Sequence, residues 1–187
     1  MYEDEIPEYL EKLKQEHEEK IFFVQHNLGA EVHWFFHQAL AALKAELYLP
    51  ACASFLIGIE ASLRITQAQI DDPAVVEELD PMKTLSNRLI KAARDNGLPV
   101  HLLAFPDEHD FDEKLATTRR NLRNIEIVRV RHDLCHGNIL EHRNPDLGDD
   151  LTFFTPECVR DLAEELYTVS KVWVVALGEF RTQRFDV

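Results

Sequence analysis

The sequence predicts an all-α fold: an up-and-down helical bundle of about five long helices that forms one domain over residues 1–187. The composition favours helices, because only 6 glycines and 8 prolines occur in 187 residues, and 45% apolar residues suffice for a core. Apolar side chains also recur at intervals of three and four residues, the spacing of a buried helix face. No stretch of any size alternates between apolar and polar residues as a sheet would.

Three helices are expected in the N-terminal half of the chain. The first runs from about Ile6 to Asn27, and residues 1–29 form an acidic helix that could be an appendage, a dimer arm, a docking site or part of the bundle. An apolar stripe at helical period predicts the second helix from about Ala30 to Leu47. The third, from about Ala51 to Ile70, is apolar almost all round, which is typical of a central helix.

Glu60 lies in the middle of this third, apolar segment. Carboxylates are rarely buried without a partner, so Glu60 should meet an arginine, a histidine or a hydroxyl group. It could form an ion pair of the core, or it could be a carboxylate that orients a residue of a functional site.

Two further helices are expected in the middle of the chain, and the second of them carries the chemically richest segment at its end. A shorter helix runs from about Met82 to Asp95, because Asn96-Gly97 is a helix stop, and a loop follows from Gly97 to Asp110. The next long helix runs from about Phe111 to Cys135. Gly137 then fits the left-handed position that caps a helix at its C-terminus.

The last helix is expected from about Pro156 to Phe180, because Thr155-Pro156 is typical of an N-cap followed by a first-turn proline. Before it, Ile139 to Glu141 and Leu151 to Phe154 could pair as a small hairpin.

The charge is strongly negative, −14 at pH 7, which disfavours broad binding to nucleic acid. Residues 114–131 nevertheless hold six basic residues and one acidic residue. This stripe could contact phosphate at one confined site, or it could be a solvated helix face paired with acidic neighbours.

The sequence predicts a cytoplasmic protein with no membrane segment. The N-terminus lacks the basic start and apolar stretch of a secretory signal. Three cysteines, at positions 52, 135 and 158, form no Cys-x-x-Cys pair, which fits a reducing compartment.

The run Arg131-His132-Asp133-Leu134-Cys135-His136-Gly137 is the best candidate for chemistry. His132 and His136 are four residues apart and share a helix face, so they could ligate a metal with Glu60 or His142. The His-Glu-x-x-His protease pattern is absent, because Asp133 stands where the glutamate would be. We therefore expect neither a metal nor a cofactor.

Phosphoryl chemistry without a metal is the other interpretation of this run. Cleavage of RNA by its own 2′-hydroxyl needs a base, an acid and positive charge on the phosphate. Histidine titrates near neutral pH and can serve as acid or base, and arginine offers a planar fork that matches phosphate oxygens. Arg131 and His136, at the end of one helix, could supply most of these functions.

Arg131-His132-x-x-x-His136-Gly137 resembles the Arg-(polar)-x-x-x-His signature of HEPN domains, helical bundles of which many are endoribonucleases in toxin–antitoxin, defence or RNA-processing systems. The apolar helix with Glu60 is similar to the second long helix of that family, and the resemblance covers about Ala30 to Phe180. Its specific part is the seven-residue motif.

The resemblance implies a homodimer in which two copies of the motif face one cleft. Arg131 would hold the scissile phosphate, His136 would handle the 2′-hydroxyl or the leaving group, and His132 would support the site by hydrogen bonding. Cleavage of the RNA substrate would be independent of metal and leave a 2′,3′-cyclic phosphate. A nucleotidyltransferase-type antitoxin would be a partner. The alternative is a non-catalytic HEPN-like module that binds nucleotides or proteins.

Helix geometry leaves the identity of the arginine open. Each residue of an ideal helix turns by about 100°, so positions 131 and 136 would point about 140° apart. Arg129, His132 and His136 instead fall on one stripe. Asp133 and Glu60 are candidate supporting residues. A purely structural interpretation pairs Arg131 with Glu60 in the core and leaves His136 as a favourable charge at the helix end.

Overall fold

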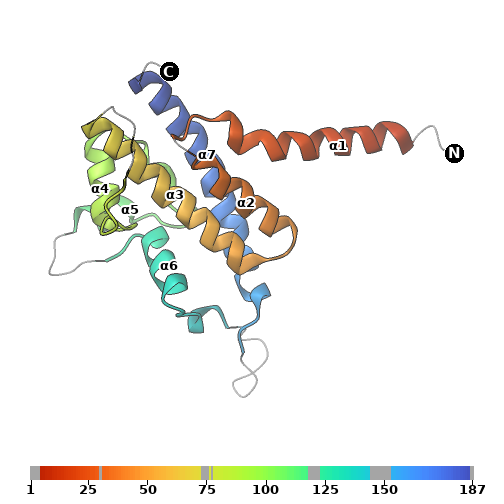
Figure 1. Ribbon diagram of the computed structural model, residues 1–187. Coiled ribbons are helices and arrows are strands. Elements are labelled where there is room, and N and C mark those ends of the chain that lie inside the picture. Colours follow the sequence, from red (N-terminus) through yellow and green to blue (C-terminus); the bar gives the residue numbers. More distant parts are fainter. Residues whose placement is uncertain are drawn as a thin grey trace.

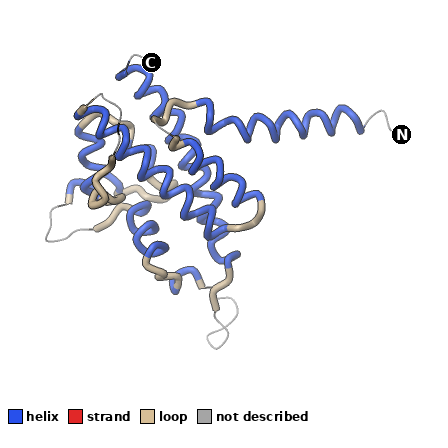
Figure 2. The backbone as a smooth tube through the Cα atoms, in the orientation of Figure 1, coloured by secondary structure: helices blue, strands red, loops and turns tan. Residues whose placement is uncertain are grey.

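A computed structural model describes residues 5–29, 31–72, 76, 78–117, 123–143 and 153–185, without the side chains of residues 5–8, 12 and 140. The secondary structure in this part of the chain is helical throughout, as Figures 1 and 2 show, which confirms the all-α prediction. The α-helices are α1 (Glu5–Phe22), α2 (His33–Lys44), α3 (Tyr48–Asp71), α4 (Asn87–Asp95), α5 (Phe111–Ala116), α6 (Glu126–Cys135) and α7 (Arg160–Phe185). Short 3-10 turns cover Phe23–Gln25, Val100–Leu103, Leu140–His142 and Pro156–Val159.

The core is built around α3, which packs against α2 and α7 (Figure 1). Phe55, Ile59 and Leu63 of α3 are fully buried, as the apolar pattern of this segment predicts. The indole N–H of Trp173 on α7 donates to the hydroxyl of Ser62 on α3 at 2.9 Å, so these two buried polar groups are paired. This packing makes α3 the platform on which the neighbouring helices lie.

By length and composition, α3 is the one described helix that could also cross a membrane. In the structure, 56% of its most apolar window is buried inside the protein. Length and composition alone do not distinguish a membrane-crossing helix from the core helix of a bundle.

Helix α1 extends away from the other helices (Figure 1). Tyr9 and Leu10 on this helix are 61% and 57% exposed. Near its C-terminal end, Glu19 pairs with Lys44 of α2. The acidic N-terminal segment is therefore helical as predicted, but α1 ends at Phe22, five residues before the expected boundary at Asn27.

The prediction of one long helix from Phe111 to Cys135 is wrong, because α5 ends at Ala116 and α6 begins at Glu126. Thr117 and Ile125 both have extended backbone. The side-chain amide of Asn87 on α4 explains the second extended stretch: its Nδ2 donates to the Arg123 carbonyl at 2.8 Å, and its Oδ1 accepts the Ile125 N–H at 3.1 Å. This side chain satisfies the backbone groups that a continuing helix would have paired.

The prediction of a small hairpin is also wrong for its first strand, Ile139 to Glu141, because Leu140–His142 form a 3-10 turn. The backbone N–H groups of Ile139 and His142 bond locally, to Gly137 at 3.0 Å and to Ile139 at 3.1 Å, and are not available for a strand. Of the second arm, Leu151 and Thr152 lie outside the described residues.

N-cap residues mark the starts of two helical segments, at Ser86 and at Thr155. Ser86 caps α4, where its hydroxyl accepts the Leu89 N–H at 3.3 Å, so this helix begins later than the expected Met82. Thr155 caps the 3-10 turn at Pro156, as predicted, and α7 follows directly and continues past the expected end to Phe185.

Candidate functional site

The motif lies at the C-terminal end of α6, and Gly137 ends that helix as predicted. Its φ is 72°, in the left-handed region that glycine adopts without strain. The Gly137 N–H donates to the Leu134 carbonyl at 3.3 Å, and the Asn138 N–H donates to the Asp133 carbonyl at 2.8 Å. This pair of bonds is a Schellman motif, which satisfies carbonyls that the helix would otherwise leave free.

His132 and His136 form an exposed pair at this capped end. Their ring centroids are 4.4 Å apart with an angle of 48° between the planes, and both residues are exposed. The motif thus presents two imidazoles directly to solvent. Imidazole is the side chain whose ordinary pKa suits proton transfer at neutral pH.

Arg131 faces the body of the protein and meets Glu60 of α3. Its Nη2 lies 3.3 Å from Oε2 of Glu60, and the side chains of Arg131 and Glu60 are 23% and 15% exposed. The expectation that Glu60 meets an arginine is therefore confirmed. Within the described part of the chain, no hydrogen bond, ion pair or ring contact joins Arg131 to His132 or His136.

Glu60 serves three partners at once. Besides Arg131, its Oε1 lies 3.5 Å from Nη1 of Arg64, and its Oε2 accepts the backbone N–H of Leu85 at 2.8 Å. Arg64 also donates to the Asp80 carbonyl at 2.6 Å. Two half-buried arginines thus share one carboxylate. Among the described residues Glu60 is the one acidic partner of Arg131, which leaves most of the five N–H donors of Arg131 without an acceptor in that part of the chain.

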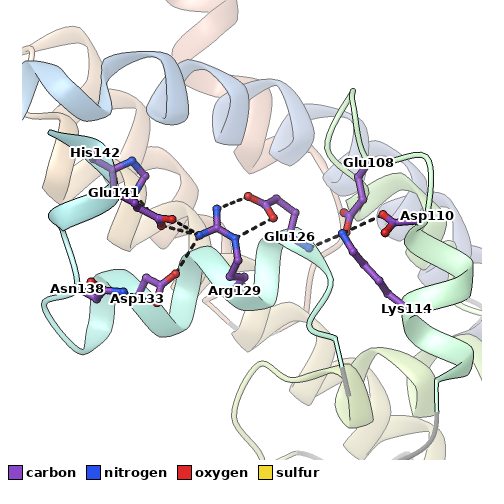
Figure 3. Close-up of polar contacts among 9 residues, drawn as sticks. All are labelled: Glu108, Asp110, Lys114, Glu126, Arg129, Asp133, Asn138, Glu141 and His142. Atoms are coloured by element: carbon purple, nitrogen blue, oxygen red, sulfur yellow. Dashed lines mark hydrogen bonds and ion pairs between the residues drawn. The ribbon is translucent and has the colours of Figure 1, made fainter. Parts of the chain in front are cut away.

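Arg129 has the opposite setting, which Figure 3 shows. Its guanidinium contacts Glu126, Asp133 at 3.1 Å, and both carboxylate oxygens of Glu141 at 2.5 and 2.6 Å. The hydrogen bonds that Arg129 donates to Glu126 and to Glu141 raise the pKa of Arg129, although burial opposes the shift. The hydrogen bond from Arg129 in turn lowers the pKa of Glu126. A phosphate could reach Arg129 only by displacing carboxylates.

Asp133 links this network to the end of the helix. Its Oδ2 accepts from Arg129, and its Oδ1 accepts from the side chain of Asn138 at 3.1 Å (Figure 3). The Asp133 side chain is 13% exposed, so it joins the capped turn to α6 and does not face solvent. Of the two arginines that the sequence left open, Arg131 is the one whose donors are mostly unpaired within the described residues.

A metal site at the histidine pair finds little support in the geometry. No group of three or more His, Cys, Asp or Glu side chains is placed to hold a metal ion in the described ranges. Glu60 binds two arginines, and Nε2 of His142 lies 3.4 Å from Glu141. Neither of the two proposed extra ligands joins His132 and His136.

The structure describes four cations of the basic stripe over residues 114–131, and all of them except Arg123 form ion pairs with acidic side chains among the described residues. Lys114 lies 2.9 Å from both Glu108 and Asp110. Arg129 and Arg131 also have acidic partners, while Arg119 and Arg120 lie outside the described residues. For these three cations, the interpretation as a helix face paired with acidic neighbours is the one that the structure bears out.

Sequence reasoning missed three residues of this region: Arg64, Glu126 and Glu141. The spacing of Glu126, Arg129 and Asp133 at three and four residues on one helix face was a usable signal. Nothing in the sequence pointed to Glu141, which reaches Arg129 only because the chain turns back after Gly137.

Comparison with known proteins identifies no relative, since no family model, curated protein or solved structure matches the chain.

Proposed function

We propose that the protein is a metal-independent endoribonuclease of HEPN type, a toxin or defence component that acts as a homodimer. The observation that carries this proposal is the contrast within α6: an arginine with unused donors, Arg131, next to two exposed imidazoles at the capped helix end. These are the residue types that phosphoryl transfer without a metal requires.

The reaction would be attack of the RNA 2′-oxygen on the adjacent phosphorus. The P–O bond to the 5′-oxygen breaks, a base removes the 2′-hydroxyl proton, and an acid gives a proton to the 5′-oxygen. His136 would move one of these protons, and His132 would support it by hydrogen bonding. Arg131 would neutralise the charge that grows on the phosphate oxygens. The products are a 2′,3′-cyclic phosphate and a 5′-hydroxyl.

A second copy of the chain would complete the site. Arg131 turns toward α3, whereas His136 is exposed at the helix end, so one protomer does not place both on one phosphate. In a two-fold dimer that pairs the ends of two α6 helices, Arg131 of one copy would meet His136 of the other. The exposure of both imidazoles is what such a surface requires.

Glu60 would be a positioning residue in this scheme. It holds Arg131 through one oxygen, at 3.3 Å, and so fixes the direction of the guanidinium without enclosing it. Arg129 would hold the helix end through Asp133 and would not contact RNA.

A second candidate is a non-catalytic HEPN-like module that binds nucleotides or a protein, such as a nucleotidyltransferase-type antitoxin. The ion pair between Arg131 and Glu60 favours it, because a paired arginine at a bundle surface needs no catalytic role. The net charge of −14 favours it as well, because it repels a polyanionic substrate.

Induced expression in growing cells tests the two candidates. We expect the wild type to slow growth and break down total RNA, and Arg131→Ala and His136→Ala to lose both effects at equal protein level. His101→Ala is the matched control, since it removes another exposed histidine far along the chain from the motif. Intact RNA and equal growth in all four cultures would favour the binding module.

A further inference from the structure

A polar cavity lies beside the N-terminal end of α6, away from the histidines. Its volume is about 230 Å³. The loop before α5, α5 itself, the first residue of α6 and α7 all contribute to its lining. The lining residues are Phe105, Asp107, Glu108, Asp110, Lys114, Glu126 and Glu165.

The lining carries five carboxylates and one ammonium group. Lys114 lies between Glu108 and Asp110, 2.9 Å from each, as Figure 3 shows. Arg129 pairs with Glu126 from outside the cavity. These contacts leave the cavity with an excess of negative charge that the described cations do not neutralise.

Glu108 is the most buried of the acidic side chains, at 2% exposure. Its Oε1 is well satisfied: it accepts from Lys114 at 2.9 Å and from the backbone N–H of Glu126 at 2.7 Å. Its Oε2 is buried and has no hydrogen-bond partner among the residues that the structure describes. A buried carboxylate oxygen without a donor is costly, so a donor that reached Oε2 would stabilise this side chain.

Glu165 of α7 is a second acid that lines the cavity. No cation in the described part of the chain forms an ion pair with it or with Asp107. Burial raises the pKa of Glu165, and the nearby charges of Asp107, Glu126 and Asp161 raise it further. Glu165 therefore lines the cavity without a counterion among the described residues, and Glu108, from another element, lines it with one unpaired carboxylate oxygen.

We propose that this cavity binds an organic cation, a guanidinium or primary ammonium group that donates to Glu108 and Glu165. The volume of about 230 Å³ is below the range of about 300–1,000 Å³ for drug-sized ligands, so it suits a cationic head group rather than a whole nucleotide. The negative lining rejects phosphate. A guanidinium carries five N–H donors, enough for several separate carboxylate oxygens.

A divalent metal fits the same residues less well. Such an ion needs oxygen ligands that converge at about 2.0–2.6 Å. The described side chains form no group of three or more that could hold a metal, and Glu108, Asp110 and Glu126 already accept hydrogen bonds from protein cations. N–H donors reach separate oxygens at about 2.9 Å and need no such convergence.

The cation could belong to a free small amine or to an arginine side chain of a partner protein. Isothermal titration of the full chain with agmatine, which carries both a guanidinium and an ammonium group, tests the shared chemistry. N-acetyl-arginine amide is titrated in parallel. Tighter binding of agmatine would indicate a free diamine, and tighter binding of the capped arginine would indicate a partner's side chain.

Glu165→Gln is the test variant, and Glu164→Gln is its matched control. Glu164 is the exposed neighbour on α7 and does not line the cavity. Its substitution by glutamine therefore removes the same charge without changing the site. We expect Glu165→Gln to weaken binding roughly tenfold or more, as the loss of a charged hydrogen bond does, and Glu164→Gln to change it less than about twofold.

Three results would overturn the proposal. One is the absence of binding by the wild type at ligand concentrations up to about 10 mM. Another is equal weakening by Glu165→Gln and Glu164→Gln, which would mean non-specific attraction to an acidic surface. The last is displacement of agmatine by stoichiometric Ca²⁺ or Mg²⁺, which would make the cavity a metal site.

Discussion

Arg129 and Arg131 lie two residues apart on α6, yet they stand in opposite electrostatic settings. Arg129 is enclosed by the carboxylates of Glu126, Asp133 and Glu141. Arg131 shares the single carboxylate of Glu60 with Arg64. On one side of α6, three carboxylates surround one guanidinium group. On the other side, two guanidinium groups share one carboxylate.

This difference separates a structural arginine from one that is available to an anion. Carboxylates that surround a guanidinium take up its donors and hold it in one position. A guanidinium that shares its counterion keeps donors and net positive charge, which is what a phosphate ligand needs. The same helix thus carries an anchor on one side and a candidate phosphate contact on the other.

The largest expected effect comes from removing the shared carboxylate. Glu60→Leu leaves Arg64 and Arg131 half-buried without a counterion and the Leu85 N–H without its acceptor. We expect the free energy of unfolding to fall by about 3–5 kcal/mol, measured by urea denaturation. Glu60→Gln should fall between this variant and the wild type, because its amide oxygen can still accept from Leu85.

Glu164→Leu is the control for this prediction, because it places the same side chain at an exposed position of α7. It should change the free energy of unfolding by less than about 0.5 kcal/mol. Equal urea midpoints for Glu60→Leu and Glu164→Leu would show that Glu60 does not organise the two arginines.

Arg129→Ala should destabilise the fold more than Arg131→Ala, whereas we expect Arg131→Ala to reduce RNA cleavage more than Arg129→Ala. Arg129→Ala leaves three carboxylates close together without a cation, so we expect it to lower the free energy of unfolding by about 1–2 kcal/mol. Arg131→Ala leaves Glu60 paired with Arg64 and should cost less than about 1 kcal/mol. Thermal unfolding of both variants in one buffer provides the measurement, and the reverse order would contradict the comparison.

The smallest effect is a pH dependence that Arg129 should control. The hydrogen bond from Arg129 places the pKa of Glu126 below its ordinary value of 4.5. A lowered pKa in the folded state means that Glu126 stabilises the fold above about pH 4.5, and this contribution disappears as the pH falls through the folded value. The stability difference between wild type and Arg129→Ala should therefore shrink on acidification toward about pH 3.

Urea denaturation of both proteins at about pH 7, 5 and 3 measures this change. A difference that stays constant over this range would mean that the pair of Glu126 and Arg129 does not contribute to folding.

Local signals made part of the structure predictable from the sequence. Gly137 as a helix cap and Thr155-Pro156 as a helix start depend on neighbouring residues alone, and both are confirmed. A polar or cationic partner for Glu60 was predictable because burying an unpaired carboxylate in an apolar helix is costly. Arg64 and Arg131 are these partners.

Features that depend on residues far apart in the sequence could not be predicted in this way. The break before α6 results from the side chain of Asn87, which binds the backbone of residues 123 and 125. Glu141 reaches Arg129 because of a turn that the sequence suggested was a strand. Helical spacing alone placed Arg129 with the histidines, and only the three-dimensional arrangement reveals that its donors are occupied.

Cleavage of a labelled RNA by purified protein in excess EDTA tests the central claim most directly, with the product ends analysed for 2′,3′-cyclic phosphate. We expect the wild type and Arg129→Ala to cleave and Arg131→Ala and His136→Ala to be slower by about 100-fold or more, as the loss of a phosphate contact or an acid–base group predicts. Absence of cleavage by the wild type, or loss of activity in Arg129→Ala with full activity in Arg131→Ala, would contradict the account.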